Sequence, residues 1–160
     1  MSAYWRIFSG LLAACTAALA LAGCTSTPEA SSERDQEAKQ FIPHPGTAAV
    51  YVYRTDFGTE DMMSSHSVLW VDNRLIGSTV PRTYFRMDLR PGRYVLHGDG
   101  PDTGRLAVDT KAGEIYFVSL NAQGGVSRFA LVNPVAGRKE IERCCSLLEN
   151  WAPGQRPLLR

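Results

Sequence analysis

The residues best placed for chemistry on this chain are a cysteine and the three residues before it, Leu21-Ala22-Gly23-Cys24. A cysteine thiol becomes a nucleophile when it loses its proton. An uncharged, apolar segment runs from Ile7 to Ala22, after the single charge of Arg6, and Cys24 lies just beyond its end. An Ala- and Leu-rich run that ends in small residues is typical of a secretory signal peptide. A transmembrane helix is the alternative, because the uncharged stretch just reaches that length.

Leu21-Ala22-Gly23-Cys24 resembles the lipobox of bacterial lipoproteins. That resemblance implies a diacylglyceryl group on the Cys24 thiol, cleavage after Gly23 and acylation of the new amino end. Residues 1–23 are then a signal peptide, and two or three acyl chains attach the remainder firmly to a membrane. Thr25 stands where an Asp commonly retains such proteins at the inner membrane. In a Gram-negative bacterium we therefore expect an outer-membrane lipoprotein that faces the periplasm.

Two further cysteines, Cys144 and Cys145, would lie in an oxidising compartment at the location that the lipobox implies. We expect both to pack as small apolar side chains. A bond between neighbouring cysteines strains the peptide between them and does not suit a helix interior. An intermolecular disulfide is the alternative, whereas a redox role lacks the usual Cys-x-x-Cys spacing.

The three histidines, His44, His66 and His97, lack the spacing of a paired metal site. His66 follows Met62-Met63, and soft sulfurs with an imidazole could bind Cu(I). The ligand set is incomplete, so we predict an exposed loop over residues 57–66, with no metal or cofactor.

Motifs for catalysis and for nucleic-acid binding are missing from the sequence. No Gly-x-Ser-x-Gly elbow occurs, and Gly124-Gly125 lacks the lysine of a phosphate-binding loop. The chain holds 17 basic and 16 acidic residues, without the basic excess of a nucleic-acid-binding protein. We therefore predict a protein that is not an enzyme and does not bind nucleic acid.

Arginines and a tyrosine cluster around one predicted hairpin: Tyr84, Arg86, Arg90 and Arg93. Alternate residues of a strand point to one face, so Tyr84 and Arg86 should share a solvent-facing surface. Guanidinium and phenol groups there could bind an anionic glycan or an acidic partner. The alternative is a solvated strand face whose charges keep the sheet soluble.

The elements that must position these residues are mostly strands. Apolar and alternating runs separated by turn signals predict about eight short strands: 48–53, 68–71, 75–77, 84–89, 94–97, 105–109, 115–120 and 126–132. This spacing is typical of an antiparallel β-sandwich, an all-β fold. The strand at 48–53 is apolar on both faces, which indicates a central position.

One C-terminal amphipathic helix should begin at Asn133-Pro134, since proline is tolerated in a first turn. Four residues then form an apolar stripe at helical spacing: Ile141, Cys144, Cys145 and Leu148. Residues 24–40 are small and polar and predict a flexible tether with a short helical turn from Glu33. The sandwich domain should cover residues 41–149, and residues 150–160 an irregular tail.

A second resemblance runs from Glu37 to Leu148. It rests on Val50-Tyr51-Val52-Tyr53-Arg54, Val71-Asp72, Ile76-Gly77, Leu89-Arg90-Pro91-Gly92 and Tyr116-Phe117-Val118. These motifs are similar to those of the bacterial envelope domain of unknown function numbered 2846. The middle section also resembles the PEGA module, which implies a small β-sandwich for surface display. Neither resemblance implies a catalytic residue.

Together these features predict a lipid-anchored envelope protein that acts as a protein-interaction or scaffold module. A module that binds cell-wall or surface glycan is the alternative, with Tyr84, Arg86, Arg90 and Arg93 as its face. An enzyme with a site that no motif reveals is a third, weaker hypothesis.

Overall fold

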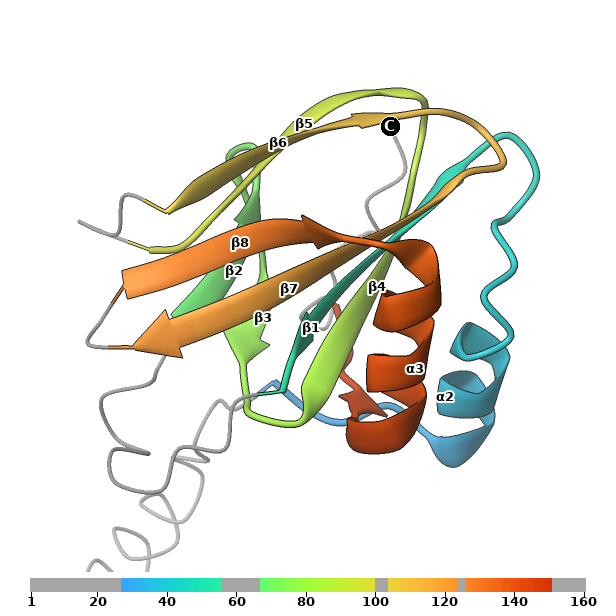
Figure 1. Cartoon of the computed structure of the whole chain (residues 1–160), viewed down its shortest axis with the longest axis horizontal. Coiled ribbons are helices and arrows are strands. Elements are labelled where there is room, and N and C mark those ends of the chain that lie inside the picture. The colour runs from blue at the N-terminus through green and yellow to red at the C-terminus, as the bar shows by residue number, and fades with distance from the viewer. Residues whose placement is uncertain (1–26, 56–66, 100–103, 124–125, 151–160) are drawn as a thin grey trace, which may run out of the picture.

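The computed structural model describes residues 27–55, 67–99, 104–123 and 126–150. These residues form nine strands and two helices in the order α2 (Ser32–Ala38), β1 (Ala48–Arg54), β2 (Ser67–Val71), β3 (Arg74–Thr79), β4 (Thr83–Leu89), β5 (Gly92–His97), β6 (Arg105–Thr110), β7 (Ile115–Gln123), β8 (Val126–Val132), α3 (Pro134–Cys144) and β9 (Ser146–Leu147). They build a five-stranded sheet, β8-β7-β1-β4-β9, and a four-stranded sheet, β3-β2-β5-β6 (Figure 1). The prediction of a mostly-β, sandwich-like fold is confirmed.

β1 is the central strand of the larger sheet, as its sequence predicted. All seven of its residues are buried. Val50 and Val52 point into the core between the two sheets, whereas Tyr51 and Tyr53 belong to a second core on the other side of β1. β-branched and aromatic residues suit such a position because they fill both faces of a pleated strand.

The larger sheet is mixed, so the prediction of a purely antiparallel sandwich is wrong in this part. β1 pairs antiparallel with β4 but parallel with β7, and β4 pairs parallel with β9. The chain passes through the four-stranded sheet between β4 and β7 and returns beside β1 in the same direction. That smaller sheet is antiparallel throughout, as predicted.

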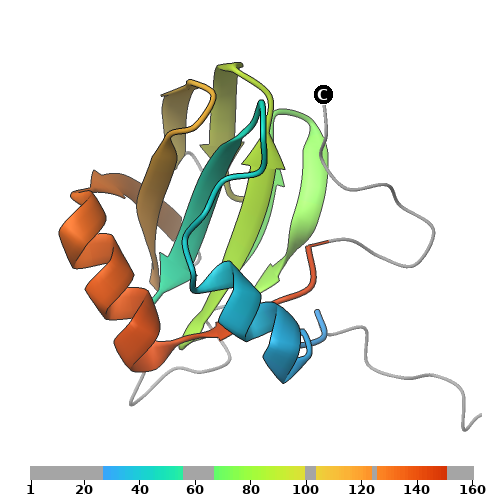
Figure 2. The same cartoon turned by 90° about the vertical axis from the view of Figure 1, so that its right-hand side faces the viewer.

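Two helices cover the outer face of the five-stranded sheet: α3, and α2 where the sequence predicted a short helical turn (Figure 2). Ala38 of α2 and Ile141 of α3 are buried there against Tyr51, Tyr84 and Phe117. This second core is rich in rings that contact one another, such as Tyr51 and Phe117 with centroids 5.2 Å apart. Neither helix among the described residues is long and apolar enough to span a membrane.

α3 begins as predicted and ends earlier than predicted. The Asn133 side chain accepts a hydrogen bond from the backbone N–H of Val135, and Pro134 follows the cap. Cys145 is already extended, with φ −123° and ψ 141°, and the next two residues form β9 beside β4. The predicted helical stripe is therefore wrong beyond Cys144. Pairing with the edge of the sheet satisfies the backbone groups that another helical turn would otherwise have satisfied.

Candidate functional site

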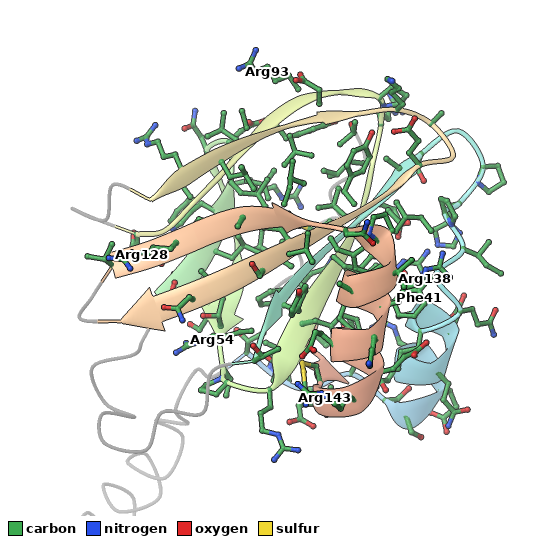
Figure 3. All side chains as sticks on the ribbon, in the orientation of Figure 1. Phe41, Arg54, Arg93, Arg128, Arg138 and Arg143 are labelled. Carbon is green, nitrogen blue, oxygen red and sulfur yellow. A yellow bond between two sulfur atoms is a disulfide. The ribbon has the colours of Figure 1, made fainter. Side chains whose placement is uncertain are left out.

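The four residues predicted to form one exposed face do not do so. Tyr84 is buried in the core beneath α2, and the Arg86 side chain, on the same face of β4, is only 10% exposed. Arg90 and Arg93 are exposed, but Arg93 lies on β5 in the other sheet and points away from the sandwich (Figure 3). Alternation along β4 correctly separated its two faces. It could not reveal that helices cover the polar one.

Arg86 is held within the protein. Its Nη2 donates to the carbonyl oxygen of Ile42 at 2.9 Å and to Asp88 Oδ1 at 3.1 Å. Its guanidinium lies 6.0 Å from the centre of the Tyr51 ring. These contacts fasten the segment after α2 onto the sheet, so the Arg86 guanidinium has a structural role within the protein.

The Asp35 latch, formed by Asp35, Lys39, Tyr84 and Leu147, joins three elements. Asp35 Oδ1 accepts hydrogen bonds from the Tyr84 hydroxyl at 3.0 Å and from the Leu147 N–H at 2.9 Å. Asp35 Oδ2 lies 2.7 Å from Lys39 Nζ. One carboxylate of α2 therefore binds both β4 and β9. Burial, and next the Asp35 charge, raise the pKa of Tyr84, so its hydroxyl keeps the proton that it donates.

Tyr51 makes a second connection between the sheet and α2. Its hydroxyl donates to the carbonyl oxygen of Ala38 at 2.7 Å, at the end of the helix. Burial raises the pKa of Tyr51 to about 12. The Ala38 carbonyl also accepts a hydrogen bond from the Phe41 N–H at 3.1 Å, so Tyr51 joins the sheet to the turn that ends the helix.

The anchor junction is the place where residues 27–30 meet residues 147–149. The Thr27 hydroxyl accepts a hydrogen bond from the Ser78 N–H of β3 at 2.8 Å. Two backbone bonds follow, from the Ala30 N–H to the Leu147 carbonyl and from the Glu149 N–H to the Pro28 carbonyl, each at 2.9 Å. Glu149 also forms an ion pair with Arg34 of α2. The two ends of the described chain thus fasten each other to the sheet.

The expectation of a flexible tether covered residues 24–40, and this junction corrects it for residues 27–40, the part that the structure describes. From Thr27 onward the segment is bonded to β3 and β9, and α2 is packed on the larger sheet. The segment has the polar composition of a linker, but its backbone groups and the buried Ala38 find partners on the sheet. Composition alone did not reveal those partners.

The two adjacent cysteines form a disulfide, which corrects the expectation that both pack as free thiols. Cys144 and Cys145 are bonded at the end of α3, and Cys145 is buried. One of the two objections to such a bond was that it does not suit a helix interior. Because Cys145 is extended, the pair lies at the helix end instead.

Several predicted residues lie outside the described part of the chain: Leu21, Ala22, Gly23, Cys24, and the loop 57–66 with Met62, Met63 and His66. Of the other histidines, His97 has both ring nitrogens within hydrogen-bond distance of carbonyl oxygens, those of Gly98 and Asp72. Within the described ranges no group of three or more His, Cys, Asp or Glu residues could hold a metal ion.

Sequence analysis missed Asp35, although one local signal was present. Lys39 follows it at the i, i+4 spacing that favours an ion pair on a helix. The partners that give Asp35 its structural role, Tyr84 and Leu147, lie far along the chain, and only the fold brings them to it.

Comparisons with known proteins give one distant relative. An uncharacterized protein of Haemophilus influenzae is 27% identical over 132 residues, which cover 79% of this chain and 77% of the relative. No family model matches the chain, and no solved structure does. The resemblances to the family numbered 2846 and to the PEGA module therefore stay predictions.

Proposed function

We propose that this chain is a lipid-anchored protein of the cell envelope that acts without catalysis, as a protein-interaction module held close to the membrane. The lipobox-like residues that end at Cys24 support the anchor. The observation that carries the proposal is the anchor junction, because it fastens the chain to the domain from Thr27 onward.

The junction sets how far the domain can stand from the lipid. Only Thr25 and Ser26 separate Cys24 from Thr27. Three residue steps span at most about 10 Å. A free, flexible tether from Cys24 to Gln40 would allow a root-mean-square reach of about 20 Å, with longer excursions. The module then meets partners that are themselves at the membrane surface.

The glycan alternative loses its expected face. Tyr84 is buried, and Arg86 donates to Ile42 and Asp88. The protein-interaction hypothesis does not depend on those residues.

The proposal is tested by cross-linking the full-length protein in cells and identifying the adducts by mass spectrometry. The first control is Cys24→Ser, which removes the thiol that would carry the lipid. A second variant inserts a Gly/Ser spacer of about twelve residues after Ser26, which leaves the folded domain unchanged and lengthens its reach.

We expect a discrete envelope protein to be cross-linked by the native chain and lost with Cys24→Ser. The spacer should weaken that adduct, because it releases the domain from the membrane surface. Cross-linking that Cys24→Ser does not change would refute the role of the anchor. A partner retained at full yield with the spacer would refute the role of the short connection.

A further inference from the structure

Three of the four edge strands in the described residues are protected against further pairing. β9 is two residues long, and its outer side accepts a hydrogen bond from Ala30. β3 has Thr27 bonded to the N–H of Ser78. β6 carries the exposed charges of Arg105 and Asp109. Covering segments, short length and charge are the usual means by which proteins protect a sheet edge.

β8, the fourth edge, is the longest of the four at seven residues and carries one exposed charge. It pairs without interruption with β7, from Phe117↔Val132 to Gln123↔Val126. It contains no proline, and Arg128 is its single charge (Figure 3). Large apolar side chains are exposed on it and just after it, with Val126 at 42%, Leu131 at 53% and Val135 at 77%. A long, regular, weakly charged edge is suited to accept another strand.

We propose that β8 pairs antiparallel with β8 of a second copy of this chain. The strand is complementary to itself about a two-fold axis at Phe129. In that register Val126 faces the partner's Val132, so apolar residues meet at both ends. Arg128 faces the partner's Ala130, so no like charges stand directly opposite. The same patch serves both copies, as a two-fold interface requires.

The registers across the sheet place the anchor junction of each copy relative to the proposed two-fold axis. Tyr53 pairs with Ser119, which pairs with Ala130 on β8. Tyr53 also pairs with Tyr84, which pairs with Leu147 at the anchor junction. The junction is therefore level with Ala130, one residue from the two-fold axis. A two-fold axis perpendicular to the sheet therefore places the two junctions on opposite sides of the joined sheet, at nearly the same level along the strands.

The test uses the full-length protein in cells with a photo-cross-linking amino acid at Val126. The matched control places the same amino acid at Ala107, an exposed residue on the edge strand β6 of the other sheet. We expect a covalent homodimer from position 126 and none from position 107.

A charged residue at position 130 then tests the register. In the proposed dimer, residue 130 of each copy faces Arg128 of the other, which gives two such pairs. Ala130→Glu should lower the dissociation constant about fivefold, and Ala130→Lys should raise it by a similar factor. The double variant Arg128→Glu/Ala130→Lys should dimerise like Ala130→Glu. Thermal unfolding of each variant checks that the fold is intact.

Three outcomes would overturn the proposal. One is an adduct from position 126 to a different protein, which would assign the edge to another partner. Another is a homodimer whose yield does not depend on the sign of the charge at position 130. The third is the absence of any adduct at position 126.

Discussion

Replacing Asp35 by alanine tests the latch that holds α2, β4 and β9 together. The change removes the oxygen that accepts from the Tyr84 hydroxyl and from the Leu147 N–H. It also removes the ion pair with Lys39. We expect Asp35→Ala to destabilise the protein much more than the loss of one surface charge would.

The size of the effect follows from the two donors that lose the carboxylate. The Leu147 N–H loses its partner, whereas the Tyr84 hydroxyl keeps a longer hydrogen bond of 3.4 Å to the Asp35 backbone carbonyl. A buried donor without a partner costs about 1–3 kcal/mol. The Asp35 side chain is 21% exposed, so water reaches part of the site and recovers some of that cost. We therefore expect a loss of about 2–3 kcal/mol in the free energy of unfolding.

Asp35→Asn separates the hydrogen bonds from the charge. Both Tyr84 and Leu147 donate to Oδ1, and asparagine can place its carbonyl oxygen there. Only the Lys39 ion pair is lost, and partly exposed pairs of this kind contribute below about 1 kcal/mol.

The assay is urea unfolding of the lipid-free protein, with Glu37→Ala as the matched control. Glu37 is an exposed acid on the same helix, so its removal changes the charge of α2 equally. Hydrogen exchange at the Leu147 amide reports whether β9 detaches before the whole domain unfolds. Equal losses for Asp35→Ala and Glu37→Ala, or for the alanine and asparagine variants of Asp35, would refute the reasoning.

Two further predictions concern the helix-covered core. In Gly137→Ala the added Cβ would lie 2.4 Å from Phe117 Cγ, so the Phe117 ring would be overpacked. We expect this to destabilise the protein by about 1–3 kcal/mol, because the overpacking exceeds the gain of about 0.5–1 kcal/mol in helix propensity. Urea unfolding beside Ala136→Gly, an exposed position one residue earlier, checks the sign, and a stabilised Gly137→Ala would contradict it. Burial raises the pKa of Tyr51 from 10.0 to about 12. The protonated Tyr51 therefore contributes fully to the stability of the fold below pH 10, and this contribution is lost as the pH rises toward 12. The free energy of unfolding should fall there by about 1.4 kcal/mol per pH unit for this group, and a Tyr51→Phe variant with the same alkaline slope would contradict the assignment.

Local patterns predicted the strands well because each strand carries its own signal. Residues 126–132 were predicted as a strand and form β8 with the same bounds. The predicted strands 68–71 and 75–77 are joined by a turn in which Asp72 adopts a positive φ of 52°, a conformation that aspartate tolerates. The parallel pairs of β1 with β7 and β4 with β9 carry no such signal, because direction in a sheet depends on the path of the whole chain.

The candidate site was predicted less well, because its contacts join residues far apart in the chain. Alternation correctly placed Tyr84 and Arg86 on one face of a strand, and the polar character of that face suggested solvent. The Tyr84 hydroxyl instead donates to Asp35 beneath a helix. A polar side chain with an internal partner is as well satisfied as one in water.

The anchor junction and β8 stand at the two ends of one sheet, and this arrangement links both proposals. The strand order places β9 at one edge and β8 at the other. Residues 27–30 occupy the side of β9, so the segment that leads to Cys24 protects an edge that would otherwise invite pairing. β8, where we propose that a second copy pairs, is the edge on the opposite side of the sheet from the proposed lipid anchor. A domain held within about 10 Å of the membrane can still present that edge sideways, where a second anchored copy moves in the same plane.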